Sequence, residues 1–166
     1  MTTVYNEYFA HYINLVNSVT PLQSLIETQK ELLLLLENAS EKQGNYRYAD
    51  EKWTVKEVVA HIIDAERVFA YRAMRFARND KTDLPGYDEN TYAQYSNAKN
   101  RSLSELKVEF DILRQSSIEL FRSFNDEALS RTGTANKMPI DVKSIFYLIA
   151  GHCQHHLNIL RERYGL

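Results

Sequence analysis

Residues 53–58 carry the clearest helix-start signal in the chain, reading Trp53-Thr54-Val55-Lys56-Glu57-Val58. The Thr54 hydroxyl can accept a hydrogen bond from the backbone of Glu57, and the Glu57 carboxylate can bond back to the cap. Trp53 and Val58 flank this cap and are placed to pack together. The apolar residues that follow recur at helical spacing, which predicts an amphipathic helix over about 55–79. Its apolar face comprises Val58, Ile62, Ala65, Val68, Phe69 and Phe76.

Similar start signals occur at three other places. Thr20-Pro21 predicts a helix over about 21–38, because threonine can cap and proline suits the first helical position. Ser102 begins a further capping box, for a helix that ends near Asn125. Asp141 caps the last helix, which runs to about Arg163. No run of residues is convincing as a strand. The sequence therefore predicts an all-α fold, a four-helix bundle with at least one long crossover connection.

Three segments lie outside these helices. Residues 1–18 are rich in aromatic residues and are expected to form an N-terminal arm packed on the bundle, with a partly frayed terminus as the alternative. Residues 80–101 form a long connection that serves as a crossover. Because the segment contains the tyrosines Tyr87, Tyr92 and Tyr95, it could also close over a ligand as a lid. Residues 126–140 are expected to be irregular.

Composition and charge indicate a single domain over residues 1–166. The chain is 44% hydrophobic and 25% charged, with a net charge of -2. Acidic and basic residues are mixed, without a basic stripe, so we expect no nucleic-acid partner. There is no secretory signal, and the aliphatic run at 32–36 is too short to span a bilayer, so we expect no membrane association. The single cysteine, Cys153, excludes an internal disulfide and favours a cytoplasmic location.

Three of the five histidines lie in the segment Gly151-His152-Cys153-Gln154-His155-His156. At about 100° per residue, His152 and His156 fall near the centre of the apolar face of the last helix. His155 falls at the edge of that face and would replace a ligand if the helix were rotated by one residue. Two imidazoles four residues apart on one face can share a metal ion, but a zinc-type site needs a further protein ligand.

His61 can supply that ligand, because it lies toward the core side of the helix over 55–79. If this helix faces the last one, His61, His152 and His156 form a three-histidine metal site with an open coordination position. The alternative is that these histidines are hydrogen-bonded core residues that bind nothing.

Four neighbouring residues have both a functional and a structural interpretation. Glu57 and Asp64 could accept the second N–H of the His61 imidazole, or they are ordinary solvated carboxylates. Arg72, three turns beyond His61, could meet an anionic substrate, or it extends to the surface. Cys153 could be a metal ligand or nucleophile, or it is a small buried residue. No general base can be named, so the catalytic residues stay unknown.

Several separated segments resemble the DinB/YfiT-like superfamily, and the DinB-like subgroup in particular. They occur in the family's order and span nearly the whole chain. The segments are Trp53-Thr54-Val55-Lys56-Glu57-Val58-Val59-Ala60-His61-Ile62-Ile63-Asp64-Ala65-Glu66-Arg67, Ala77-Arg78-Asn79-Asp80, Leu84-Pro85-Gly86-Tyr87-Asp88-Glu89, Gly133-Thr134-Ala135-Asn136 and the region from Ile149 to Tyr164.

The resemblance implies a four-helix bundle with a crossover, frequently dimeric, so a homodimer is expected. It implies one divalent transition metal, nickel, zinc or iron, bound by His61, His152 and His156. Relatives include S-transferases and isomerases that use low-molecular-weight thiols such as bacillithiol or mycothiol. Cys153 is a departure, because relatives often have glutamate there, and any catalytic support from that glutamate is missing in this chain.

The leading hypothesis is therefore a metal-dependent enzyme of the thiol S-transferase type that acts on a small molecule. A metal-dependent hydrolase is the second reaction considered. A metal-binding or stress-response bundle without turnover is a different class, mildly favoured by the cysteine at 153. The last alternative is a structural dimer whose histidines are satisfied within the core.

Overall fold

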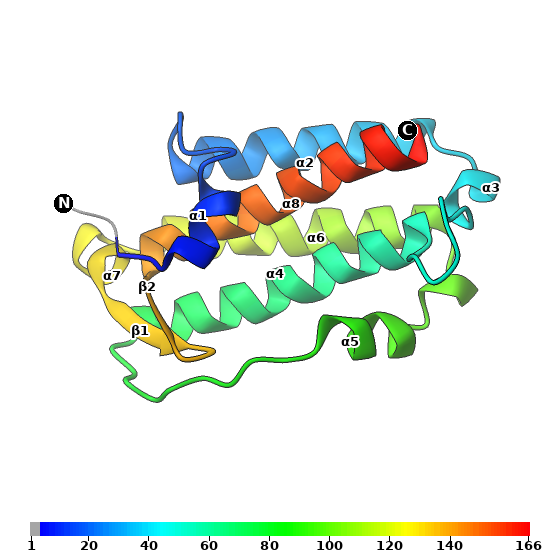
Figure 1. The fold of residues 1–166 in the computed structure, drawn as a ribbon. Coiled ribbons are helices and arrows are strands. Elements are labelled where there is room, and N and C mark those ends of the chain that lie inside the picture. Colours follow the sequence, from blue (N-terminus) through cyan, green and yellow to red (C-terminus); the bar gives the residue numbers. More distant parts are fainter. Residues whose placement is uncertain (1–3) are drawn as a thin grey trace.

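The computed structural model describes residues 4–166 and shows a four-helix bundle, as predicted (Figure 1). Its long helices are α2 (Pro21–Asn38), α4 (Val55–Ala77), α6 (Leu103–Arg122) and α8 (Val142–Tyr164). α8 packs beside α2 and α4, and α6 packs beside the same two helices. α4 and α8 are thus neighbours, which is the arrangement that a site shared between them requires.

The long helices begin at the predicted caps. Capping boxes are present at Thr54 and at Ser102, and the Asp141 side chain caps α8. At Thr20 the hydroxyl accepts the backbone N–H of Gln23, and the Gln23 side chain donates to the carboxylate of Glu27. Local capping chemistry therefore explains where each bundle helix starts.

The crossover follows from the helix directions. α2 and α8 run one way along the bundle, and α4 and α6 run the other way (Figure 1). Since α4 and α6 are parallel neighbours, the chain that leaves the end of α4 must run back along the whole bundle before α6 can begin. Residues 78–102 make this return. This return holds α5 (Glu89–Tyr95), which packs on α4, and a 3-10 turn, η1 (Ala98–Asn100). A short α3 (Glu41–Gly44) joins α2 to α4.

The expectation of an irregular segment over 126–140, without strands, was wrong. It contains α7 (Asp126–Ser130) and an antiparallel hairpin of β1 (Thr132–Ala135) and β2 (Met138–Asp141). Asn136 and Lys137 form its two-residue turn with φ of 50° and 63°, as a type I′ turn requires. Strands of four residues are too short to show an alternating pattern in the sequence.

The N-terminal arm lies against α8 and the hairpin. α1 (Glu7–Ile13) packs on α8, and Tyr5 pairs with Ile140 in an isolated bridge. The Val4 N–H donates to the Asp141 carboxylate over 2.6 Å. At Gly151 the two backbones are so close that an added Cβ would lie 2.1 Å from the carbonyl oxygen of Tyr12. Residues 1–3 of the predicted arm lie outside the described residues, and the single domain over 1–166 stays a prediction.

The buried apolar side chains form two clusters along the bundle. On α4 one cluster ends at Ile63 and the other begins at Ala73, and on α8 the change falls between Ala150 and Cys153. Buried polar residues lie in the middle, where the clusters meet, among them His61, Glu66, Arg114 and His152. None of the helices in residues 4–166 is long and apolar enough to cross a membrane.

Candidate metal centre

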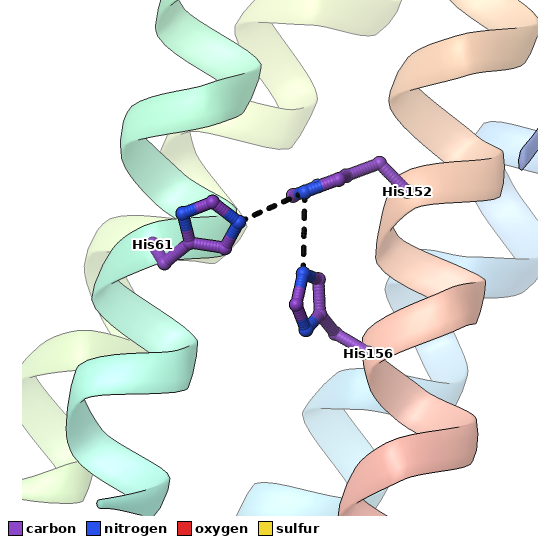
Figure 2. Close-up of side chains that lie close together, drawn as sticks. All are labelled: His61, His152 and His156. Carbon is purple, nitrogen blue, oxygen red and sulfur yellow. Dashed lines mark hydrogen bonds between the residues drawn. The ribbon is translucent and has the colours of Figure 1, made fainter. Parts of the chain in front are cut away.

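Three histidine side chains meet between α4 and α8 (Figure 2). His61 comes from α4, while His152 and His156 come from successive turns of α8. The Nε2 atom of His152 lies 2.9 Å from Nε2 of His61 and 3.2 Å from Nε2 of His156. One ring nitrogen from each histidine lies within 4.8 Å of the other two. The structure thus brings together the three residues that the sequence selected.

Hydrogen bonds among these rings do not satisfy the cluster. A neutral imidazole has one N–H and one lone pair, so Nε2 of His152 cannot donate to one neighbour and accept from the other. Nδ1 of His156 is buried without a hydrogen-bond partner in residues 4–166. A buried polar atom left unpaired costs about 1–3 kcal/mol. Because Nε2 of His152 can pair with only one of its two neighbours, the converging Nε2 atoms fit a shared cation better than a hydrogen-bonded core. A cation at Nε2 of His156 would not pair its Nδ1, which is the other nitrogen of the ring.

Burial keeps the three imidazoles neutral. Their exposed fractions are 8% for His61, 7% for His152 and 8% for His156. Burial lowers the pKa of His61 to about 4. Burial and the neighbouring histidines lower the pKa values of His152 and His156 well below the ordinary value. A neutral imidazole keeps the lone pair that binds a metal, and three such nitrogens suit zinc, nickel or iron.

Aromatic rings enclose the histidines. The Trp53 ring centroid lies 4.8 Å from that of His61. The Tyr12 and Phe69 centroids lie 5.7 Å and 5.9 Å from that of His152. These rings restrict the orientations of the imidazoles and limit the access of water, so the donors are held in place before any ligand arrives.

The three histidines line a pocket of about 220 Å³ between the N-terminal arm, α4, α8 and the crossover. Its other polar lining residues are Tyr8, Tyr12, Arg72, Tyr87, Glu89, Asn136 and His155. Burial raises the pKa of Tyr87 to about 12, so its phenol stays protonated at neutral pH. The cluster is therefore one wall of a small pocket and is accessible to a small molecule. A larger groove, of about 720 Å³ along α6, has no histidine or cysteine in its lining.

The two carboxylates considered as partners of His61 are engaged elsewhere. The Glu57 carboxylate accepts the backbone N–H of Thr54 over 2.7 Å and its hydroxyl over 2.9 Å, as part of the helix cap. Asp64 lies 3.5 Å from Arg67 in an ion pair. Neither carboxylate is placed on the His61 imidazole, and neither is an ordinary solvated side chain, because Glu57 closes the helix cap and Asp64 is half-buried beside Arg67.

Cys153 points away from the histidines, toward α2. Its side chain is fully buried, and Sγ lies 3.9 Å from the carbonyl oxygen of Thr28. Burial raises the pKa of the thiol to about 11. Cys153 is therefore a small buried residue, and neither its position nor its ionisation suits a ligand or nucleophile.

His155 lies at the pocket wall, outside the trio. It is half-buried, and its ring packs against His11 and Tyr12 with centroid distances of 5.4 Å and 5.3 Å. The helical wheel placed it correctly at the edge of the apolar face. Sequence reasoning did not select Tyr12 or Asn136 as pocket residues, because they reach the pocket from the arm and from the unforeseen hairpin.

The fold defines a class of helical proteins, a bundle in which a crossover joins the parallel helices α4 and α6. The three-histidine cluster between α4 and α8 gives this bundle a candidate metal site. The chain belongs to the DinB superfamily, whose family model matches residues 24–160. The resemblance seen in the sequence is thereby confirmed. Comparison with curated protein sequences gave no match.

The solved structures that are similar to the chain include the following two. One is YfiT from Bacillus subtilis, described as a probable metal-dependent hydrolase with an unusual four-helix bundle topology. It is 24% identical with a TM-score of 0.74, over 87% of this chain and 86% of that chain. The other is a mycothiol-dependent maleylpyruvate isomerase, 11% identical with a TM-score of 0.70, over 83% of this chain and 58% of that chain. At these identities the likeness shows a shared fold.

Proposed function

We propose that the chain is a divalent-metal enzyme that transfers the sulfur of a low-molecular-weight thiol to a small-molecule acceptor. The observation that carries this proposal is the convergence of three buried, neutral imidazoles on a small pocket. His61, His152 and His156 would hold one ion through ring nitrogens, with zinc, nickel and iron as the suited metals. The description of one similar structure as metal-dependent supports a metal, and that of the other as mycothiol-dependent supports a thiol.

An ion held by three neutral ligands would keep its full charge and would lower the pKa of a thiol that reached it. In the transfer a sulfur–carbon bond forms, the leaving group departs with the electrons of its own bond, and the thiol proton passes to solvent or to the leaving group. Trp53 and Phe69 pack against the imidazoles and keep the reacting sulfur away from bulk water. Glu89 and His155 are titratable lining groups that can take part in the proton's exit.

Thiol transfer is preferred to hydrolysis because the pocket has few bases. Activating a water molecule and protonating a leaving group both gain from a positioned acid or base. The one carboxylate in the lining is Glu89, which is exposed. A free thiol has a pKa of about 8.5, so it needs less help to ionise than water does. Metal-dependent hydrolysis is the second candidate, supported by the description of YfiT.

Metal analysis of the purified protein tests the site. We expect one transition-metal ion per chain after loading, and its loss from H152A/H156A. The matched controls are H155A and H11A, which remove nearby imidazoles outside the trio and should keep the metal. Stoichiometric metal in H152A/H156A, or none in the unmodified protein, would overturn the three-histidine site.

Turnover assays separate the candidate functions. The metal-loaded protein should consume bacillithiol, mycothiol, glutathione or cysteine in the presence of an electrophile such as 1-chloro-2,4-dinitrobenzene, and H61A should not. Release of nitrophenol from test esters, without thiol consumption, would favour the hydrolase instead. Stoichiometric metal without turnover in either assay would favour the metal-binding or stress-response bundle. A homodimer and a cytoplasmic location also stay predictions.

A further inference from the structure

We propose that Arg72 binds a carboxylate group of the molecule that occupies the histidine pocket, so that the enzyme acts on a small acid. This inference rests on the proposed function for the sulfur end of that molecule. It adds a second anchoring point and defines a substrate class. The burial of Arg72, its single hydrogen bond and the wall around it support the proposal.

Arg72 is buried yet incompletely paired. It is 7% exposed and lines the same pocket as the three histidines. Its Nη2 donates to the carbonyl oxygen of Pro85 over 2.8 Å. Within residues 4–166 it has no other hydrogen-bond acceptor and no ion pair with a carboxylate. The nitrogens of Arg72 that lack an acceptor are not fully buried, so they stay accessible from the pocket and free to donate, and a carboxylate supplies both charge and bidentate acceptors.

The wall that orients Arg72 is held by two distant segments of the chain. The Leu84 N–H donates to the carbonyl oxygen of Thr134 over 3.0 Å, and the Asn136 N–H donates to that of Leu84 over 2.8 Å. A Cβ added at Gly86 would lie 2.6 Å from Oδ1 of Asn136, so the crossover and the hairpin turn are in close contact. The Pro85 carbonyl is therefore fixed, and with it one edge of the guanidinium.

The neighbouring groups favour a single carboxylate over a more highly charged anion. Tyr87 and Asn136 line the pocket beside Arg72 and are neutral hydrogen-bond donors. Glu89 lines the same pocket and would repel a second negative charge. A phosphate is usually held by several cations or by a helix N-terminus. One arginine with neutral donors matches the charge and shape of one carboxylate.

The positions of Arg72 and His61 set the shape of the ligand. They are eleven residues apart on one face of α4, which is about 16 Å along the helix axis. The pocket volume of about 220 Å³ corresponds to about seven water molecules. A small elongated acid fits these limits, with its reacting end at the histidines and its carboxylate at Arg72. The carboxylate can belong to the thiol or to the acceptor.

Calorimetric binding of matched probes to the metal-loaded protein tests this proposal. The probes are 3-mercaptopropanoate, 6-mercaptohexanoate and 8-mercaptooctanoate, each paired with the mercapto alcohol of the same length. For at least one length we expect the acid to bind about tenfold to a hundredfold tighter than the alcohol, as a hydrogen-bonded charge contributes. In R72Q the acid and the alcohol should bind with equal affinity, and in R72K the acid should keep part of its advantage.

R75Q is the control, because Arg75 lies one turn further along α4 and pairs with Asp80 outside the pocket. It should keep the acid-to-alcohol ratio. A ratio near one in the unmodified protein, or a ratio unchanged in R72Q, would overturn the proposal. So would stronger competition by inorganic phosphate than by acetate. The ratio compares two ligands of one variant, so a merely structural role for Arg72 would not change it.

A second measurement with the same probes distinguishes failure of the thiol chemistry from failure of the carboxylate site. If none of the six thiols changes the visible absorption of protein loaded with cobalt, the thiol proposal fails. Hexanoate and hexan-1-ol, which lack sulfur and differ only in the carboxylate, then test Arg72 alone. If R72Q weakens binding of the sulfur-free acid, the carboxylate site is supported and the carboxylate belongs to the acceptor. Binding that is absent or insensitive to R72Q overturns this site. An R72Q-sensitive ratio in the thiol series assigns the carboxylate to the thiol.

Discussion

Two buried polar clusters occupy the middle of the bundle, and they differ in how completely the protein itself satisfies them. In the first, Arg114 of α6 donates to both carboxylate oxygens of Glu66 at 2.9–3.1 Å. Its remaining nitrogen donates to the Leu25 carbonyl over 2.9 Å and to the Thr28 hydroxyl over 2.8 Å. Every part of this arginine is paired, and its side chain is fully buried.

The second cluster, the three histidines, forms no ion pair within residues 4–166 and leaves Nδ1 of His156 without a partner there. Both clusters use α4, because His61 and Glu66 are five residues apart and point about 140° away from each other. One face of the helix thus carries an internally closed ion pair. The other carries donors aimed at a pocket. The difference teaches that a buried polar group indicates a ligand when its pairing is incomplete and a pocket is beside it.

Breaking the closed pair should have the largest effect. R114M leaves the Glu66 carboxylate buried without a partner, so we expect the free energy of unfolding to fall by about 3–5 kcal/mol in urea denaturation. The double variant E66L/R114M removes both charges and should recover most of that loss. Metal content should be unchanged in every variant that folds. Equal destabilisation of the single and double variants would show that the arginine acts mainly by packing.

Lowering the pH should destabilise the protein through its buried histidines, by an amount comparable to or smaller than the loss in R114M. The pKa of His61 is about 4 in the folded protein, below the ordinary value of 6.5, so the unfolded chain binds more protons between these values. Stability of the metal-free protein should fall as pH drops from about 6.5 toward 4, by on the order of 3 kcal/mol from His61 alone. Urea denaturation across this range measures it.

The variant H61Q/H152Q/H156Q is the control for the acid effect. It should lose most of the fall in stability over the same pH range. If the fall persisted in full, groups other than the trio would have to be responsible.

A side chain added where the arm contacts α8 should have a smaller effect on stability, confined to the pocket side of the bundle. In G151A the new Cβ would meet the Tyr12 backbone, which must shift, and we expect a loss of about 1–3 kcal/mol. Hydrogen exchange should rise in residues 4–18 and stay unchanged around Glu66. G44A is the matched control, because its Cβ meets the flexible side chain of Leu103, far from the arm. An arm whose protection did not change in G151A would contradict the close approach.

The smallest effect is expected at Cys153, which adjoins His152 in sequence but belongs to the other side of α8. C153A should cost about 1 kcal/mol through a small cavity and should leave the metal content unchanged. The buried thiol of the unmodified protein should react slowly with Ellman's reagent. Loss of metal in C153A would place this residue with the histidines instead.

Much of the bundle could be predicted because its signals are local. Capping residues at 54, 102 and 141 and the apolar periodicity that follows each cap fixed the helices to within a few residues. The pairing of α4 with α6 as parallel neighbours, the hairpin over 132–141 and the helix in the crossover were not foreseen. They depend on long-range contacts, such as Leu84 with Ala135, that leave no pattern in either segment alone.

The candidate site divides in the same way. His61, His152 and His156 could be selected because each lies toward the apolar side of a well-marked helix. The role of Arg72 could not be decided from the sequence, because an arginine at the edge of a helix face can equally be a surface residue. Its burial depends on the crossover, which covers it in the folded structure. The positions of Tyr12, Gly86 and Asn136 became visible only once the arm, the crossover and the hairpin were placed together.

The hydrogen bond from Val4 to Asp141 has a consequence for the order in which the protein is built during translation. Asp141 caps α8 and also binds the arm, so one carboxylate serves the start of the chain and the start of its last helix. The arm precedes α8 in the chain, so it is synthesised before the surface on which it docks. The pocket wall that contains Tyr12 is therefore completed only after translation has passed α8.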